Sequence, residues 1–364
     1  MKLAEIIRAL EQWAPPSYQE SYDNSGLITG DKKWELSGVL ISLDCIESVV
    51  DEAISKGCNL IVAHHPIVFR GLKSLTGKNY VERTLIKAIK NDVAIYAIHT
   101  NLDNVHTGVN KKIAETIGLQ NVKILSPKND TLSKLVAFVP TENKENVLTA
   151  LHGAGAGTIG NYSDCSFSST GTGTFTPNGE ADPHIGESGK SEQVTEERIE
   201  LIFSSHNQNQ ILSTLKKAHP YEEVAYYITQ LLNTNQDVGA GMVGDLNEKF
   251  GTTDFIKLIK EKFNLSVVRH TDFHQEKIQR VAVCGGAGSF LLSKAKAANA
   301  DVFITADYKY HEFFDADKQI TIFDIGHYES EVFTKELIYG YLKEKFANIA
   351  LHLSEVVTNP IKYS

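Results

Sequence analysis

Cysteine is scarce in this chain of 364 residues, and no two cysteines are spaced as Cys-x-x-Cys. This absence argues against a disulfide framework and against a zinc site built from thiolates, and it favours a reducing compartment. The four cysteines are Cys45, Cys58, Cys165 and Cys284.

Long apolar runs and an excess of positive charge are also absent. No segment approaches the roughly 20 apolar residues of a membrane-spanning helix, so we expect no membrane contact. The net charge of -9 argues against a broad nucleic-acid-binding surface. Residues 1–13 carry apolar side chains at helical spacing among charged ones, which indicates an amphipathic helix rather than a signal peptide. We therefore expect a cytoplasmic protein.

The N-terminal part of the chain alternates strands with helices. Apolar runs at residues 39–43, 59–63 and 93–98 predict buried strands, and residues 47–56 and 82–91 predict the helices between them. Such alternation is typical of an α/β fold with a mostly parallel sheet covered by helices.

A similar pattern recurs near the C-terminus, with strands predicted at residues 281–284, 301–305 and 321–325 and a helix at 289–298. Residues 300–307 align on residues 58–65 without a gap, so that Asp307 falls on His65. We interpret the two segments as pseudo-duplicated halves of one discontinuous domain, residues 1–124 and 239–364. Any two strand-helix-strand units resemble each other, and chance similarity is the equal alternative.

The middle segment, residues 125–238, has a different pattern and is predicted to be an inserted domain. Its predicted elements follow the order βαββαβ, which is the order of an α+β ferredoxin-like module. The predicted strands are 135–140, 165–176, 199–204 and 224–232, and the predicted helices are 144–152 and 208–218. A polar loop is expected at 177–196.

Two adjacent histidines, His64 and His65, follow the second predicted strand, and Pro66 comes next. Successive side chains within a strand face opposite sides, but beyond the strand end the chain can turn and bring both rings to one place. Taken alone, the pair is more often two ordinary histidines than a metal site.

Two other predicted strands also end in polar side chains, because residues 99–103 include His99 and Asp103 and residues 326–331 include His327 and Glu331. The carboxyl ends of parallel strands are where ligands bind in such sheets. His327 and Glu331 are four residues apart and share one face if the segment is helical, although a solvated helix face would show the same spacing.

The five side chains together favour a dinuclear metal site. An open mononuclear zinc site uses three protein ligands, whereas five suit two divalent ions about 3.5–4 Å apart with a bridging carboxylate. Glu331 is the expected bridge. Three histidines favour Zn²⁺, and Fe²⁺ or Mn²⁺ also accept this ligand set. The expected metal ligands are His64, His65, Asp103, His327 and Glu331.

These motifs resemble those of the GTP cyclohydrolase 1 type 2 homologue family of dinuclear metal-centre proteins, in its long bacterial form with an inserted domain. The resemblance implies two metal ions on the five residues above and a toroidal homohexamer. The matching segments are residues 22–27 (YDNSGL), 61–66 (IVAHHP), 99–103 (HTNLD), 305–312 (TADYKYHE) and 326–331 (GHYESE).

The resemblance leads us to expect a metal-dependent hydrolase of a small molecule. GTP cyclohydrolase type 2-like activity is implied by the family name only. The alternative is a non-catalytic metal-handling or regulatory scaffold in which the inserted domain senses a ligand. Turnover on metal-loaded protein would distinguish the two.

Other residues are candidates for the surroundings of the site. A glycine-rich turn at residues 284–289 is an expected phosphate cradle or, equally, a tight turn. A second turn, residues 155–160, matches a dinucleotide motif by letter but follows a helix, which is the wrong order. The residues expected near the metals or a substrate are His99, Asp307, Lys309, His311, Gly285, Gly286 and Gly288.

Residues 219–222, His-Pro-Tyr-Glu, resemble a segment of CutA-like and nitrogen-regulator-like proteins. The resemblance implies an oligomer contact or a small-ligand site. An ordinary turn between helix and strand is the equal alternative.

Overall fold

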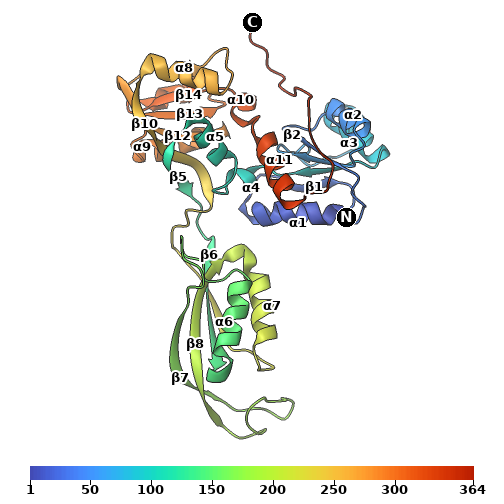
Figure 1. Cartoon of the computed structure of the whole chain (residues 1–364), viewed down its shortest axis with the longest axis vertical. Coiled ribbons are helices and arrows are strands. Elements are labelled where there is room, and N and C mark those ends of the chain that lie inside the picture. Colours follow the sequence, from blue (N-terminus) through green and yellow to red (C-terminus); the bar gives the residue numbers. More distant parts are fainter. The chain divides into compact units, whose positions relative to one another are not determined.

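The computed structural model describes residues 1–364, which fold into two compact units. The first unit combines residues 1–127 and 236–364, and the second consists of residues 128–235. The first unit contains two sheets and the second contains one (Figure 1). None of the helices is both long enough and apolar enough to cross a membrane.

The five-stranded sheet of the first unit has the order β1-β4-β3-β2-β15. Strands β2, β3, β4 and β15 are parallel, and β1 pairs antiparallel with β4. Its strands are β1 (Gly26–Thr29), β2 (Val39–Ser42), β3 (Leu60–Ala63), β4 (Ala94–Ala97) and β15 (Leu351–Leu353).

Side chains alternate between the two faces of this sheet, and helices cover both. Val39 and Ile41 belong to the core under α1 (Leu3–Trp13) and α11 (Thr334–Lys345). The alternate residue Leu40 belongs to the core under α2 (Glu47–Ser55) and α3 (Tyr80–Lys90). Because both faces of the sheet are buried, the sequences of these strands are continuous apolar runs.

The six-stranded sheet has the order β11-β14-β13-β12-β10-β5. Only the β12-β13 and β13-β14 pairs are parallel. Its strands are β5 (Gln120–Pro127), β10 (Gly239–Gly251), β11 (Arg269–His270), β12 (Lys277–Ala287), β13 (Val302–Ala306) and β14 (Thr321–Asp324). The helices packed on it are α5 (Val109–Ile117), α8 (Thr252–Lys262) and α9 (Leu292–Ala297).

The expectation of one mostly parallel sheet is therefore wrong, because the unit is mixed α/β and its two sheets both contain antiparallel pairs. The antiparallel strands β5 and β10 carry many polar residues and are only partly buried, so they lack the apolar runs that the prediction used. The helix predicted at 289–298 is instead a 3₁₀ turn, Ser289–Leu291, followed by the short α9.

The second unit has one antiparallel sheet of order β7-β8-β6-β9. Its elements follow one another as strand, helix, strand, strand, helix, strand, as the sequence predicts. They are β6 (Leu132–Pro140), α6 (Lys144–Gly153), β7 (Phe167–Phe175), β8 (Glu192–Ser204), α7 (Gln208–Ala218) and β9 (Tyr226–Gln230). Strand β8 begins earlier than predicted and takes up the last part of the expected loop.

Candidate metal centre

His64 follows β3 directly and is completely buried. Its Nδ1 lies 2.8 Å from the carbonyl oxygen of Ile98. A carbonyl oxygen only accepts, so Nδ1 carries the proton and Nε2 presents a lone pair. This Nε2 is buried and has no hydrogen-bond partner. A buried, unpaired polar atom destabilises the folded protein unless a cation binds its lone pair.

The ring of His65 is oriented by a carboxylate that lies just after the neighbouring strand, β2. Its Nδ1 lies 2.8 Å from Oδ1 of Asp44, which comes shortly after β2. The other oxygen of Asp44 accepts a hydrogen bond from the hydroxyl of Thr358 near the C-terminus. A carboxylate on Nδ1 orients the ring and makes Nε2 the ligand atom, as in many metal-bound histidines.

His327 is the first residue of α10 (His327–Glu331) and is oriented in the same way. Its Nδ1 lies 2.7 Å from Oδ2 of Asp307, which follows β13. Its Nε2 comes within 3.3 Å of Nε2 of His65. Two imidazole nitrogens with lone pairs do not approach so closely unless a proton or another cation lies between them.

Glu331 ends α10 and lies between the histidines with only 3% of its surface exposed. Its Oε2 is 2.9 Å from Nε2 of His65 and 3.0 Å from Nε2 of His327. Its Oε1 faces Nε2 of His64 at 3.9 Å. The two carboxylate oxygens therefore face different histidines, as a bridging ligand requires.

Asp103, at the end of α4 (Thr100–Asp103), completes the His64 side of the site. Its Oδ1 lies 3.6 Å from Nε2 of His64, and this oxygen is also buried without a hydrogen-bond partner. Two unpartnered buried ligand atoms that face each other across this distance are suited to hold a cation between them.

The pKa values reflect the strong coupling between these groups. Burial lowers the pKa of His65, but its hydrogen bonds to Asp44 and Glu331 outweigh burial and raise the pKa to about 9. Burial likewise opposes protonation of His327, yet the charge of Glu331 and the bond to Asp307 raise its pKa to about 11. Burial and the charge of Glu331 raise the pKa of Asp103 to about 8. Protons and metal cations therefore compete for the same lone pairs.

The five predicted ligands thus converge on one place, and the tightest group is His64, His65 and Glu331, whose ligand atoms lie within 4.8 Å of one another. The donors are imidazole nitrogens and carboxylate oxygens, a set that zinc, iron and manganese accept. The unpartnered atoms of His64 and Asp103 show that these residues fit a metal ion.

In the glycine-rich turn, two amides are not free to form the phosphate cradle, which was one of two equal alternatives beside a tight turn. The N–H of Gly285 donates to Oδ1 of Asn110 at 3.0 Å, and the N–H of Gly286 donates to Oγ of Ser330 at 3.0 Å. These amides are already satisfied and do not face a ligand. Instead, Gly286 has a φ of 58° and leaves room for Glu331, because an added Cβ would lie 2.6 Å from Oε1. Gly288 similarly packs against Thr305.

Replacing Gly286 by alanine is expected to displace the Glu331 carboxylate and reduce the metal content of the purified protein. The added Cβ meets the Glu331 side chain, and the positive φ disfavours any residue with a Cβ. Gly340→Ala on α11 is the control, since a Cβ added there would have no atom within 4 Å. Full metal content in Gly286→Ala protein would contradict this role.

The other predicted surrounding residues divide into two groups. His99 lies near the site, with its ring 5.4 Å from that of His64, and its Nδ1 is 2.8 Å from Oδ1 of Asp23. Lys309 and His311 are exposed, and His311 contacts the rings of Tyr310 and Phe314 rather than the site. The expectation that these two residues line the metal cleft is wrong, because the chain turns into the 3₁₀ helix Tyr310–Ala316 and carries them outward.

Asp44 was not predicted from the sequence to lie at the site. Asp23 belongs to one of the matching segments, residues 22–27, but no role was predicted for it. Asp44 follows the end of β2 just as His65 follows β3, so the strand-end rule would have found it if applied to the first strand as well. Asp23 lies outside any regular element. Its contact with His99 spans 76 residues, and no local pattern signals it.

A cavity of about 460 Å³ opens onto the site and is the size of a small-molecule pocket. Its wall includes His65, His99, Asp103, His327 and Glu331. Aromatic side chains also line it, namely Tyr22, Phe69, Phe290 and Tyr328, together with residues 359–361 of the C-terminal segment. A molecule that enters this cavity reaches the imidazoles and carboxylates directly.

Comparisons with known proteins show which family this chain resembles. The family Duf34/NIF3 (NGG1p interacting factor 3) matches residues 1–360. A protein of Halalkalibacterium halodurans called GTP cyclohydrolase 1 type 2 homolog is 39% identical over 371 residues, 100% of both chains. One of the same name from Bacillus subtilis is 38% identical over 99% of this chain and 98% of its own.

Solved structures extend the similarity to the fold. A Bacillus cereus protein related to NIF3 superposes with a TM-score of 0.89 at 38% identity, over 100% of this chain and 99% of its own. Staphylococcus aureus protein SA1388 gives 0.79 at 32% identity, with the same coverage. The match covers both outer segments, which carry the histidines and carboxylates, as well as the middle unit. The chain belongs to the Duf34/NIF3 family, whose members include the GTP cyclohydrolase 1 type 2 homologues.

Proposed function

We propose that the chain holds two divalent metal ions, one on each side of Glu331. One ion would be held by His64, Asp103 and Oε1 of Glu331, and the other by His65, His327 and Oε2. The observation that carries this proposal is the arrangement of the two Glu331 oxygens, which face separate sets of ligand atoms. The three histidines favour zinc, and iron or manganese suit the same donors.

We propose further that the site hydrolyses a small molecule. Divalent ions supply a water nucleophile at neutral pH, because they lower the pKa of bound water to about 7. His99 is placed to hold or transfer a proton, since Asp23 binds its Nδ1 and leaves Nε2 available. The cavity admits the substrate, and its aromatic wall, which includes Phe69 and Tyr22, suits a planar ring.

The test is a substrate screen on metal-loaded protein, with GTP and other nucleotides included because of the names of the relatives. Ring opening of GTP would release formate, which can be measured directly. His65→Ala is the control, because it removes one proposed ligand while leaving the cavity open. Metal-dependent turnover that this variant loses would support hydrolysis. Stoichiometric metal without turnover of any compound would favour the metal-handling alternative.

We also infer that the two sheets of the first unit are pseudo-duplicated. In each, three consecutive strands are parallel, β2-β3-β4 in one and β12-β13-β14 in the other. His65 follows the middle strand of the first set, and Asp307 follows the middle strand of the second. The strand order of the middle unit, β9-β6-β8-β7, supports a ferredoxin-like fold for it.

A homohexamer remains a proposal that rests on the family resemblance. The exposed rings of Tyr310 and Phe314, 72% and 68% accessible, support it because exposed aromatic clusters are typical of contact surfaces. Light scattering on the purified chain would measure the assembly, and a monomer at micromolar concentration would rule it out.

A further inference from the structure

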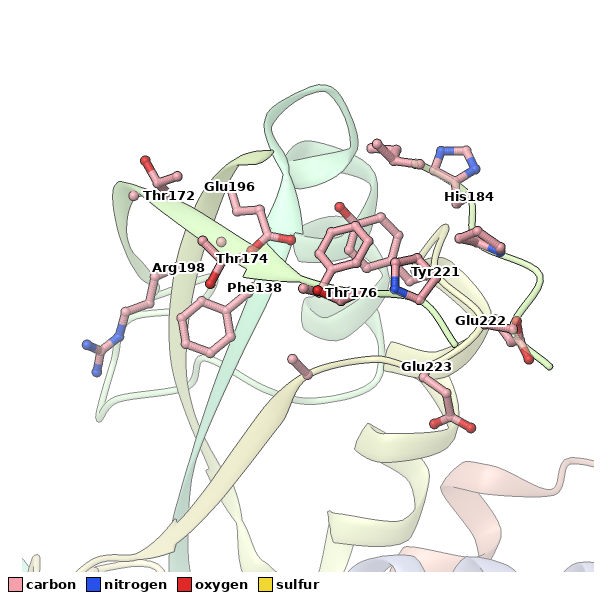
Figure 2. Close-up of a pocket in the computed structure, with 18 of the residues that line it drawn as sticks. Phe138, Thr172, Thr174, Thr176, His184, Glu196, Arg198, Tyr221, Glu222 and Glu223 are labelled. Atoms are coloured by element: carbon pink, nitrogen blue, oxygen red, sulfur yellow. The ribbon is translucent and has the colours of Figure 1, made fainter. Parts of the chain in front are cut away.

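The middle unit contains a second cavity, of about 580 Å³, which the metal chemistry does not use (Figure 2). It lies on the face of the sheet opposite α6 and α7. Phe138 alternates along β6 with Ala137 and Val139, which belong to the helix-covered core. Glu196 lies on the corresponding face of β8, since Ile199 and Leu201 pack in the core.

Glu196 is the most unusual group in this cavity. It is only 8% exposed, yet no Lys, Arg or His lies within ion-pair distance of its carboxylate. The one arginine in the wall, Arg198, is engaged by Glu200 at 2.7 Å, and Figure 2 shows its guanidinium pointing away. A buried carboxylate without a cationic partner is costly, and a bound cation would offset that cost.

The neighbouring strand leaves space for this carboxylate. Gly171 lies opposite Glu196 in the β7-β8 register, and a Cβ on Gly173 would lie 2.1 Å from its Oε2. Strand β7 therefore presents glycines where side chains would otherwise fill the cavity.

Aromatic rings surround the carboxylate on two sides. Phe138 and Tyr227 form an edge-to-face pair with centroids 5.8 Å apart. Tyr221 contacts the rings of Phe175 and His184, and Figure 2 shows the Glu196 carboxylate directed toward it. Burial and the nearby charge of Glu196 raise the pKa of Tyr221 to about 12. Aromatic faces beside a carboxylate are the usual surroundings of an organic cation.

The segment expected to resemble CutA-like proteins builds one wall of this cavity. His219 is buried, and both ring nitrogens are used, since Nε2 contacts the carbonyl of Phe138 at 2.8 Å and Nδ1 accepts from the N–H of Tyr221 at 3.1 Å. His219 thus positions Tyr221. The loop after β7 closes the other side, where the N–H of Asp182 donates to Glu222 at 3.0 Å.

We propose that this cavity binds a small organic cation, with its ammonium or guanidinium group against Glu196 and its apolar body against the aromatic rings. The volume lies within the range of small-molecule pockets. Two further carboxylates in the wall, Glu222 and Glu223, are exposed and would favour the approach of a cation over that of an anion.

Calorimetric titration of the full chain with phenethylamine tests the proposal, because 2-phenylethanol and phenylacetate have the same ring with no charge or the opposite charge. We expect binding of the amine and at least tenfold weaker binding of the other two. Glu196→Gln should weaken amine binding about tenfold or more, since a hydrogen bond to a charged group contributes about 1.5–3 kcal/mol. Tyr227→Leu should weaken it about two- to fivefold through loss of an aromatic face.

Glu197→Gln is the matched control, because Glu197 is equally buried at 7% but belongs to the opposite face of β8 and bonds Thr170. It should bind the amine as the unchanged protein does, which also shows that loss of a buried carboxylate does not itself prevent folding. Equal binding of all three compounds, or equal loss in both glutamine variants, would overturn the proposal. The proposal would also be overturned if the unchanged protein did not bind the amine and Glu196→Gln altered the oligomeric state. That result would show that a second copy of the chain covers this face.

Discussion

Glu331→Gln protein is expected to retain at most one of the two proposed metal ions, because its affinity for the lost ion should fall at least about a hundredfold. Glutamine has the same shape but offers one neutral carbonyl oxygen instead of two charged ones, so it cannot bridge two cations. The loss should exceed the 10- to 100-fold effect typical of residues that act only through a ligand. Equilibrium dialysis against Zn²⁺, followed by elemental analysis, measures the content per chain.

Glu329→Gln is the matched control for this experiment. Glu329 lies on the same short helix, but its carboxylate accepts a hydrogen bond from Asn359 at 2.9 Å and does not contact the histidines. This variant should keep the full metal content. Two ions in the Glu331→Gln protein would show that the bridging assignment is wrong, whatever the control retains.

Removal of metal should lower the melting temperature by about 5–10 °C for each ion lost. A ligand at a hundredfold excess over its dissociation constant stabilises the folded state by about 2.7 kcal/mol. A domain of this size shifts by about 2–4 °C per kcal/mol. The unpartnered atoms of His64 and Asp103 supply the physical reason, because without an ion they remain buried and unsatisfied. Scanning calorimetry before and after chelation, then after return of Zn²⁺, measures the shift.

The Glu331→Gln variant separates metal binding from other effects of the chelator. Its melting temperature should respond to chelation much less than that of the unchanged chain. An equal response in both proteins, or none in the unchanged chain, would mean that the ions do not stabilise this site.

The candidate ligands could be picked out from the sequence because each follows the end of a strand or lies in the helix that begins there. His65, Asp103 and His327 follow β3, β4 and β14 within a few residues. Strands β3 and β4 are parallel neighbours in one sheet, so the strand-end rule explains why His65 and Asp103 lie close together. It does not explain their proximity to His327, because β14 belongs to the other sheet and the packing of the two sheets is a tertiary contact.

The mixed topology and the surroundings of the site could not be predicted in the same way. Strand β10 has little apolar periodicity, and its place in the sheet depends on pairing with β5, more than 100 residues earlier. The glycines at 285 and 286 resemble a phosphate cradle in sequence, and only the bonds to Asn110 and Ser330 show that their amides are occupied. Such contacts depend on tertiary packing rather than on local sequence.

The hydrogen bond between Thr358 and Asp44 joins residues that are far apart in the sequence, which bears on when the site can form during synthesis. Glu331 follows His65 by 266 residues, and Thr358 follows Asp44 by 314, so each pair is synthesised at widely separated times. Domains tend to fold as they are synthesised, so the middle unit, residues 128–235, can fold before the metal ligands are together. A nascent chain that has not yet reached Glu331 would carry His64 and His65 without this carboxylate, so the proposed metal site can be completed only after the middle unit has been synthesised.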